Sequence, residues 1–518
     1  MIVLATLRCL RRSAWTALVF AACAGLSGCN LEWEKPDLSI QPPAQFREGR
    51  PGSAAAIPSG RDFVVKFGSK ELTSLVEQAL TDNLDIAAAM ARIEEADAQA
   101  RMASAPLWPN AAMQNIVRTN RVAGTTLNLG NAATGISTGS TSTSSLTQTT
   151  FRGRNYGFFQ LGVASAAYEV DFWGKNEDAS YASRILANAS RFDRDTVEIA
   201  TVAAVLNAYF QVVTAQDRLR IARSNVAIAE KVNAAIQARF EVGTASVLDT
   251  AQQETVLAQQ RATIPPLEQT LLQTRNVLAV LLGRTPESFA VQGGTMTKLT
   301  FPKIDPGLPS EVLLRRPDVA SAEAKLASQE FSVLNARAQF FPSINLLGLY
   351  GTQTALIQNL LRPEALAWQA ATSMAQPLFD GFFLQGQYSN QKGLYAELAA
   401  LYRKQILTAL QDVENALIAV KELGRQLKLQ GAAVVAARRA FEASDMRLQE
   451  GTIDIITLST TQKQLFDSQE QEAVIRLNYF QAATSLYQAL GGGWTPTTRN
   501  AEIARANAAY EADKGPWP

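Results

Sequence analysis

Two stretches of the chain repeat apolar side chains every three to four positions, the spacing of an amphipathic helix, over an unusual length. The stretch from Asn176 to Ala238 contains neither glycine nor proline, and its 63 residues would form a helix about 95 Å long. The stretch from Phe382 to Leu448 is of similar length. Because helices of globular proteins average about 12 residues, these two predict a long, narrow bundle or tube.

A glycine-centred turn and a second helix follow each long helix. The turns are centred on Gly243 and Gly451, and the returning helices are predicted from Val247 to Leu282 and from Asp454 to Leu490. Glycine readily adopts the left-handed backbone that a helix end needs. The helical part is therefore predicted to be two antiparallel hairpins. Pro265-Pro266 should kink or break the first returning helix only.

Four other segments lose the helical spacing and are rich in residues that favour strands. They are Ala111–Val122, Tyr156–Val170, Ser343–Thr352 and Leu366–Phe379. Each is about 10 to 15 residues long, which is the length of a tilted strand in a membrane barrel. Four strands cannot close a barrel, and open sheet edges are not tolerated in lipid, so oligomerisation is implied.

The order of these elements repeats, which indicates an internal duplication. Asn83-Leu84-Asp85-Ile86 opens a helix as Arg316-Pro317-Asp318-Val319 does 233 residues later, whereas Arg239-Phe240 and Arg447-Leu448 are 208 residues apart. The first copy therefore holds about 25 extra residues. The segment from Asn131 to Thr150, almost wholly Ser, Thr, Gly and Ala, is the candidate for an exposed loop.

The amino terminus has the features of a secretory signal. Arg8, Arg11 and Arg12 form a basic region, and residues 13–25 form a short apolar region. Leu26-Ser27-Gly28-Cys29 follows, and small residues before a cysteine are what a lipoprotein signal peptidase requires. All 3 cysteines lie at positions 9, 23 and 29, so the mature chain would begin at an acylated Cys29 and could form no internal disulfide.

These observations divide the chain into a signal peptide, a tether, two repeats and a tail. The boundaries are 1–28 for the signal peptide, 29–70 for the lipid-anchored tether, 71–283 and 309–491 for the repeats, and 492–518 for the tail. Five prolines between Asn30 and Gly60 block regular hydrogen-bond ladders and favour extended backbone in the tether. Asn30 is not the aspartate that retains lipoproteins at the inner membrane of enteric bacteria, so outer-membrane sorting is permitted.

Charge and composition exclude several classes of function. Removing three leader arginines from a net charge of +1 leaves about −2, which gives no indication of a nucleic-acid partner. Gly135-Ile136-Ser137-Thr138-Gly139 matches a nucleophile elbow, but the chain has 0 histidines, so a Ser-His-Asp triad cannot be assembled. No catalytic residue, metal site or cofactor is predicted beyond the lipid on Cys29. We find no long uncharged apolar stretch after the leader, so we expect no membrane-spanning helix in the mature chain.

Several motifs in order give the chain a resemblance to a known family. They are Leu-Ser-Gly-Cys29, Asp171-Phe172-Trp173-Gly174, Leu314-Arg315-Arg316-Pro317-Asp318-Val319, Phe340-Phe341-Pro342-Ser343, Phe379-Asp380-Gly381 and the run from Leu486 to Trp494. Together they resemble the TolC-like outer-membrane efflux factors, in the lipid-anchored OprM/NodT-type branch that works with resistance-nodulation-division (RND) pumps. The resemblance implies an α+β membrane protein, a homotrimeric channel-tunnel. Each protomer would give four strands to a twelve-stranded β-barrel and its hairpins to a periplasmic α-helical barrel.

The resemblance also implies partners and site residues. Small toxic or amphipathic compounds would pass from an inner-membrane RND pump through a periplasmic adaptor into the duct. The turn residues implied to contact the adaptor are Arg239, Val242, Gly243, Thr244, Arg447, Glu450, Gly451 and Thr452. The tunnel constriction falls on Ile456 and Thr460, with Asp454 nearby. Relatives usually carry an aspartate at the position of Thr460, so an aspartate-based gate is in doubt.

Two other functions remain open from the sequence. One is a duct that exports proteins with an ABC-type exporter, which only the partner would distinguish. The other is a periplasmic coiled-coil scaffold without a pore, since alanine-rich helices can bundle without one. The four predicted strands, at equivalent places in both repeats, argue against the scaffold.

Overall fold

The computed structural model describes residues 33–40, 42–43, 45–47, 60–122, 126–128, 148–150, 154–302, 307–495, 500–501, 503–505 and 507–508. Cys29, the predicted signal peptide, the Gly135–Gly139 motif and most of the predicted Ser/Thr-rich loop lie outside these residues.

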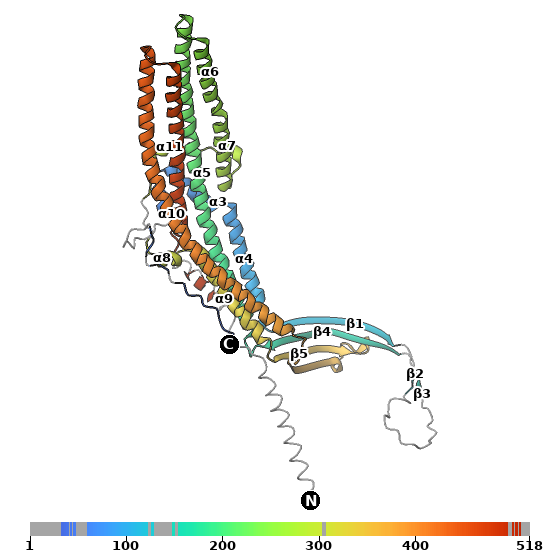
Figure 1. Ribbon diagram of the computed structural model, residues 1–518. Coiled ribbons are helices and arrows are strands. Elements are labelled where there is room, and N and C mark those ends of the chain that lie inside the picture. Colours follow the sequence, from blue (N-terminus) through green and yellow to red (C-terminus); the bar gives the residue numbers. More distant parts are fainter. Residues whose placement is uncertain are drawn as a thin grey trace.

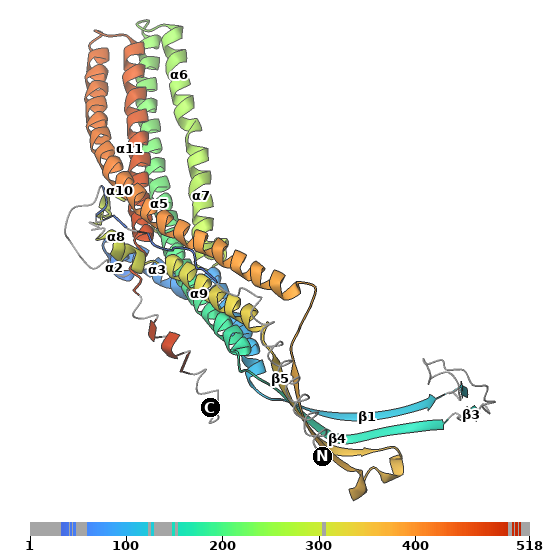
Figure 2. The same ribbon diagram turned by 60° about the horizontal axis from the view of Figure 1, so that its bottom comes forward.

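The described residues form a long bundle of helices with a curved β-sheet at one end (Figure 1). The sheet bends away from the bundle axis, and the two helical hairpins point away from the sheet (Figures 1 and 2). Short helices surround the middle of the bundle (Figure 2). The long, narrow form predicted from the helix lengths is confirmed.

The two halves of the chain contain the same main elements in the same order. The first half has α2 (Gly60–Val65), α3 (Lys70–Asp82), α4 (Leu84–Ser104), β1 (Asn110–Val122), β4 (Arg154–Val170), α5 (Lys175–Glu241), α6 (Val247–Ala262) and α7 (Ile264–Leu281). The second half has α8 (Pro309–Leu314), α9 (Pro317–Ala338), β5 (Ser343–Thr354), β6 (Leu366–Ala375), α10 (Phe383–Gln449) and α11 (Ile455–Ala489). Two short strands, β2 (Thr126–Asn128) and β3 (Gln148–Thr150), pair with each other.

Several 3-10 turns connect these elements. They are η2 (Ala105–Leu107), η4 (Pro286–Ser288), η5 (Met296–Lys298), η6 (Ile357–Asn359) and η7 (Pro363–Ala365). Proline fixes the backbone angle φ near the helical value and is accepted in the first turn, and three of the five begin at or next to a proline.

The long helices are as predicted. α5 and α10 have 67 residues each, which corresponds to about 100 Å. The predicted break in the first returning helix is also confirmed. α6 ends at Ala262, and α7 starts at Ile264 with both prolines in its first turn, where backbone N–H groups have no helical partner. α11 is one uninterrupted helix of 35 residues.

The main sheet has the strand order β1-β4-β5-β6 and is antiparallel throughout. All four predicted strands are present, but β6 ends at Ala375, not at Phe379. Pro377 has no backbone N–H to donate, so the ladder cannot continue through it. The pairing register shifts between Gln114 and Ile116 and again between Leu161 and Ala164, and such irregularities bend a sheet.

The largest apolar core lies in the middle of the molecule, where α2, α3, α5, α7 and α11 meet. Aromatic rings fill it: Phe63 stacks on Tyr487 at 4.3 Å between centroids, and Phe210 contacts both Phe67 at 5.1 Å and Phe480 at 5.3 Å. Such pairs add about 0.5–1.5 kcal/mol each beyond their burial. This core fixes both hairpins to one rigid base.

The expectation that no long apolar stretch follows the leader was wrong for one helix: among the described residues, α5 is long and apolar enough to cross a membrane, through a window of 18 residues with a mean hydropathy of 1.5. Within the protein, 56% of that window is buried. α4, α6, α7, α9 and α11 all pack against α5, so its apolar stretch serves the protein core.

Candidate functional site: tips, sheet and edges

The turn between α5 and α6 is a Schellman motif, in which a left-handed glycine ends the helix. Gly243 has φ 79°, and its N–H donates to the Phe240 carbonyl at 2.9 Å. The N–H and the hydroxyl of Thr244 both donate to the Arg239 carbonyl, at 2.8 and 3.0 Å. Val242 is the C-cap residue, and its side chain is exposed at the tip.

The turn between α10 and α11 has the same geometry. Gly451 has φ 72° and donates to the Leu448 carbonyl at 3.0 Å. Thr452 donates twice to the Arg447 carbonyl, from its N–H at 2.9 Å and its hydroxyl at 3.1 Å. Glu450 is the C-cap residue. The eight turn residues predicted from the sequence thus form two equivalent motifs, one at the end of each hairpin.

Polar side chains cap the returning helices. Ser246 and Asp249 form a reciprocal capping box at the start of α6. Asp454 caps α11 by accepting the Thr457 N–H at 2.8 Å. Hydrogen bonds from the hydroxyl and the N–H of Thr457 hold the pKa of Asp454 below its usual range. The carboxylate of Asp454 is therefore ionised and serves the helix end.

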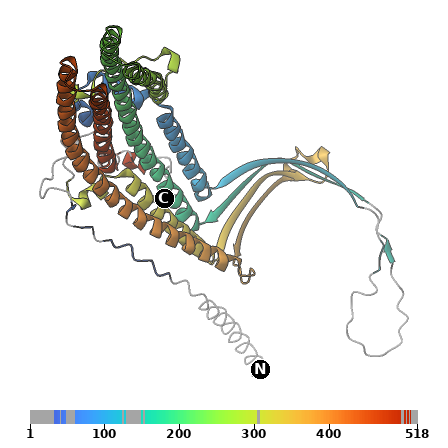
Figure 3. The ribbon, with the colours of Figure 1, turned by 45° about the horizontal axis from the view of Figure 1, so that its top comes forward.

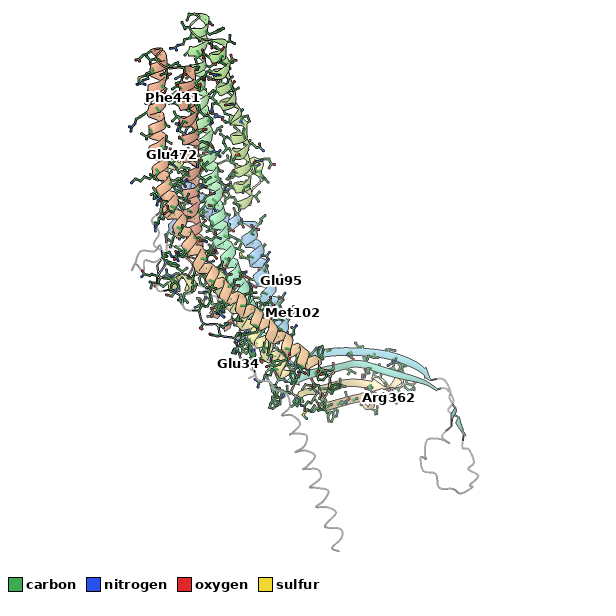
Figure 4. All side chains as sticks on the ribbon, in the orientation of Figure 1. Glu34, Glu95, Met102, Arg362, Phe441 and Glu472 are labelled. Carbon is green, nitrogen blue, oxygen red and sulfur yellow. The ribbon has the colours of Figure 1, made fainter. Side chains whose placement is uncertain are left out.

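The two tips are fastened to each other. The guanidinium of Arg239 donates to the Leu448 carbonyl of the other hairpin, which also accepts the Gly451 N–H. Below this contact lies an apolar cluster, which comprises Val232, Ile236, Leu448, Ile455 and Leu458, with Phe441 and Ile453 at its margin. Figure 4 shows Phe441 close to the tip end of α10. No sequence pattern indicated this contact, because it depends on how the two hairpins lie side by side.

Ile456 and Thr460 lie one helical turn apart on α11 and are both exposed. They line a groove of about 450 Å³ between α6 and α11. Its other lining residues are mostly amides and hydroxyls: Gln252, Thr255, Gln259, Gln260, Thr263 and Ser459, with Val256, Phe466 and the Lys463–Asp467 ion pair at 2.6 Å. The Thr460 hydroxyl donates to the Ile456 carbonyl at 2.7 Å. The groove thus has no carboxylate at the position of Thr460.

The two faces of the sheet differ. Along β5 and β6, the register pairs Ile344 with Met374 and Tyr350 with Trp368, so these side chains share one face, where Trp368 is 77% exposed. The other face carries mostly small and polar residues, with Leu347 and Leu349 among them; Asn345 pairs there with Ser373. An exposed apolar face opposite a polar one is typical of a strand between lipid and a water-filled lumen.

Aromatic residues gather where the sheet joins the helices. Trp173 stacks on Phe341 at 4.7 Å and donates its indole N–H to the Pro342 carbonyl at 2.9 Å. Phe172 and Phe379 are exposed beside the same junction. Aromatic girdles of this kind mark the boundary between membrane and water in barrel proteins. The Asp-Phe-Trp-Gly and Phe-Asp-Gly motifs therefore turn the chain between strand and helix.

The protomer is a curved slab with two unlike outer edges. α10 packs on α9 and α11 and forms one edge; α4, α6 and α7 pack on α5 and form the other. Exposed apolar residues follow both edges: Leu394, Leu401, Leu407, Ile418 and Leu429 on α10, and Leu84, Met90, Met102, Leu272 and Val280 on α4 and α7. Figure 4 shows Met102 near the sheet end of α4.

Arg316 ties three helices together near the middle of the slab. It is the N-cap residue of α9, and its nearly buried guanidinium binds Asp318 at 2.6 Å, Asp412 of α10 at 3.2 Å and the Ala489 carbonyl of α11 at 3.2 Å. The carboxylate of Asp318 also accepts the Val319 N–H at 2.9 Å, as expected in the first turn of a helix. The predicted role of Arg316-Pro317-Asp318 as a helix start is confirmed.

The described part of the predicted tether packs along the helices. Trp33 meets Tyr395 of α10 edge to face at 4.7 Å, and Phe46 is buried against Val312 and Leu490. The Arg47 N–H donates to Glu414 at 2.6 Å. Residues 33–40, 42–43 and 45–47 form no helix or strand, and the apolar residues that anchor them were not anticipated from the sequence.

No cluster of side chains that could hold a metal ion occurs in the described ranges. No three or more histidine, cysteine, aspartate and glutamate side chains gather there as metal ligands would. The Arg316 cluster holds charges that are mutually paired and fixed, which is a structural role.

Known proteins are similar to this chain in sequence and in fold. The family model described as outer membrane efflux protein matches residues 75–284 and 308–492. The pyoverdine export outer membrane protein OpmQ of Pseudomonas aeruginosa is 34% identical over 482 residues, which cover 92% of this chain and 96% of OpmQ. The solvent efflux pump outer membrane protein SrpC of Pseudomonas putida is 28% identical over 91% of this chain and 96% of its own length.

A solved structure gives the same picture. The MtrE outer membrane channel of Neisseria gonorrhoeae superposes with a TM-score of 0.75 at 24% identity, over 90% of this chain and 98% of MtrE. At this identity the likeness establishes the fold.

Proposed function

This chain belongs to the outer membrane efflux protein family, and we propose that three copies of it close into a channel-tunnel, the exit duct of a tripartite RND-type efflux pump. The family is one of transport proteins and not of enzymes, and its place is the outer membrane. The finer features proposed below are the trimer, the twelve-stranded barrel, the lipid anchor, the partners and the roles of single residues.

One observation carries the proposal: the protomer ends in unlike open edges on its two sides. α10 and the edge strand β6 follow each other on one side, and α4 and the edge strand β1 on the other. A contact between unlike edges, repeated by rotation, closes into a ring. Four strands are too few for a barrel, whereas three protomers supply twelve and leave no edge in the lipid.

The helical tips would meet the periplasmic adaptor. They lie at the far end of helices about 100 Å long, on the side away from the sheet. The two glycine-threonine turns of a protomer share one backbone geometry, so a trimer would present that geometry six times. The exposed side chain of Val242 belongs to the first of the two turns. The role covers Arg239, Val242, Gly243, Thr244, Arg447, Glu450, Gly451 and Thr452.

The groove beside the tips would form the tunnel constriction. Ile456 would narrow the resting tunnel with apolar side chains, and Thr460 would add hydroxyls where relatives usually carry a carboxylate ring. Asp454 supplies the nearby negative charge, although its carboxylate also caps α11.

A lipid on Cys29 would anchor the chain beside the barrel. Trp33 is held against α10 near the junction of sheet and helices, and the four Cα-to-Cα steps from Cys29 to Trp33 reach at most about 14 Å. The two repeats, 71–283 and 309–491, would derive from a duplication that gave each half one strand pair and one hairpin. The segments 1–28, 29–70 and 492–518 would be signal peptide, tether and tail.

The relatives favour small compounds as substrates. By name, OpmQ exports pyoverdine and SrpC serves a solvent efflux pump. We extend this to small toxic or amphipathic compounds for the present chain. An exposed apolar sheet face has no use in a periplasmic scaffold.

The test is oligomer mass and single-channel conductance of the protein extracted from outer membranes, with native chain and Cys29→Ala side by side. The expected native result is a trimer with low-conductance, mostly closed pores. The Cys29→Ala protein should lose acylation and membrane anchoring but keep the same pore once reconstituted. A monomer without conductance would refute the channel.

A further inference from the structure

The connection between β6 and α10, residues 376–382, exposes large apolar side chains that nothing in the protomer covers. Leu378 is 92% and Phe379 79% exposed, and Phe382 and Phe383 are both 69% exposed. The rings of Phe379 and Phe382 meet edge to face at 5.7 Å and form the crest of this junction loop. A contiguous apolar patch of this kind marks a contact surface.

Phe382 is held in a conformation that residues with a Cβ rarely adopt. Its φ of 69° is the one positive value at a non-glycine position in the described part of the chain. α5 starts in the same way, 208 residues earlier, at Gly174 with φ 73°. Glycine would adopt this turn without strain. A strained backbone that holds an exposed ring in place points to a contact made by that ring outside the protomer.

The opposite edge carries a matching surface at the same level. β1 begins at Asn110 and is preceded by Trp108, which is 38% exposed. The β6–α10 and α4–β1 junctions lie on opposite sides of the slab (Figure 3). β1 has 13 residues and β6 has 10, so antiparallel pairing of the whole of β6 leaves three residues of β1 over. Such pairing brings the end of β6 to the start of a neighbouring β1.

Lipid would cover only part of the exposed surface. The apolar row continues from Phe383 down α10 to Leu394 and Leu401, which lie on the helix that runs away from the sheet. On the other edge, Met102 of α4 continues the surface below Trp108. A second copy of the chain covers both the loop and the helix, because each edge keeps its apolar character across the sheet–helix boundary.

We propose that the junction loop is the periplasmic clasp between protomers: Leu378, Phe379 and Phe382 of one copy seat against Trp108 and the start of β1 in the next. The clasp rests on the proposed trimer and adds a specific contact to it. It closes the ring just outside the membrane, where strand pairing ends and helix packing begins.

Cross-linking tests the clasp directly, because all 3 native cysteines lie within the first 29 residues. The full chain carrying Trp108→Cys and Leu378→Cys is treated in outer-membrane fractions with a short bifunctional thiol reagent. Denaturing gels should show covalent dimers and trimers, and either single variant should stay monomeric. The matched control pair, Trp108→Cys with Tyr350→Cys, uses an exposed residue of the central strand β5 and should give no ladder.

A second variant measures the effect on assembly. Leu378→Asp should lower the trimer fraction in native mass measurements by ~10-fold, because a charge resists burial between apolar surfaces. Leu361→Asp, at an 86% exposed position in the β5–β6 connection, should leave the trimer intact. Far-ultraviolet circular dichroism of both variants would show that the protomers fold.

The outcomes separate the clasp from the proposed function. A native chain that is not trimeric refutes the channel-tunnel itself. A trimer with no ladder, and with a spin label at position 378 that relaxes with lipid-soluble oxygen, assigns the loop to the membrane and overturns the clasp. A trimer with the ladder, and its loss in Leu378→Asp, supports it.

Discussion

Thr460 illustrates how one residue can set the charge of a constriction. Its hydroxyl is engaged with the Ile456 carbonyl, and the nearby charges, Lys463 and Asp467, are paired. The nearby negative charge of Asp454 also caps α11, so we expect the native pore to be only weakly cation-selective.

Thr460→Asp should make the reconstituted pore cation-selective, because three carboxylates would then meet at the narrowest point. Reversal potentials across a salt gradient measure this. Thr460→Asn, of similar size but neutral, is the control and should behave as the native chain. A native pore that is already strongly cation-selective, and unchanged in both variants, would place the constriction elsewhere.

Asp178, near the start of α5, carries a charge that destabilises the folded protein. Burial, reinforced by the carboxylates of Asp171 and Glu177, raises its pKa to about 6. The unfolded value is about 3.9. A raised pKa means that the neutral form stabilises the protein, so this contribution is present below pH ~4 and is lost as the pH rises through about 6.

Asp178→Asn should raise the melting temperature at pH 8 and leave it unchanged at pH 3.5. After allowance for partial exposure, we expect a gain of about 1 kcal/mol at pH 8. Thermal unfolding of reconstituted protein at the two pH values gives the answer. Equal shifts at both would mean that packing, and not charge, governs this site.

Residue types predicted turn and cap positions well, since glycine and threonine at a helix end act locally. Gly243 and Gly451 end their helices and Arg316 begins one, as the sequence around each of them predicts. Asp454 was interpreted as a nearby charge of the constriction, and its capping role was missed, although an aspartate three residues before Thr457 at a helix start is a recognisable N-cap signal.

At the scale of elements, the two hairpins pack on each other through α5 and α11, and their main apolar contacts lie in the central core and at the tips. The bond from Arg239 to the Leu448 carbonyl is the polar part of the tip contact. Arg447 is the equivalent of Arg239 at the second turn. Among the described residues it makes no hydrogen bond to the other hairpin.

Arg239→Ala should loosen the tips and raise the open probability of single channels several-fold at unchanged unit conductance. A hydrogen bond from a charged group contributes about 1.5–3 kcal/mol, enough for such a shift. Arg447→Ala is the matched control and should change open probability less. Identical records for both variants would show that the Arg239 contact does not hold the closed state.

Element boundaries followed the sequence wherever glycine or proline acts within a few residues. The split between α6 and α7 and the ends of α5 and α10 are such cases. The end of β6 was placed four residues too late, because the apolar row through Leu378 and Phe379 outweighed Pro377 in the pattern. That row belongs to an exposed loop.

On the scale of the whole molecule, the amino-terminal segment links the sheet end of the bundle to its middle. It runs from Trp33 on α10 to Phe46 in the cluster around Val312. Its described residues form no helix or strand, so its position depends on these two anchors together with the Lys35–Glu330 ion pair, the Arg47–Glu414 bond and the packing of Ile40.

Trp33→Ala combined with Phe46→Ala should release the segment and speed tryptic cleavage after Arg47 by ~10-fold or more, because a segment must leave the helices it packs on to be cut. Mass spectrometry of timed digests measures the rates. Glu34→Ala, an exposed position, is the control. Unaltered cleavage in the double variant would mean that other contacts hold the segment.

The sequence predicted long hairpins, four strands and an assembly larger than one chain, because helical spacing and strand length are properties of a continuous segment. It did not predict the tip contact, the groove between α6 and α11 or the packing of the amino-terminal segment on the helices. Each joins residues hundreds of positions apart or on different hairpins, and such placement depends on the three-dimensional packing of both repeats.

The split at Pro265-Pro266 occurs in one hairpin only. In a ring of three protomers, six hairpins would then alternate between jointed and stiff. A force on the helical tips would bend the three hairpins that contain the α6–α7 break before the other three. The opening between the tips would therefore widen as a triangle and not as a circle. The shape of the largest cargo that fits would follow the geometry of that triangle.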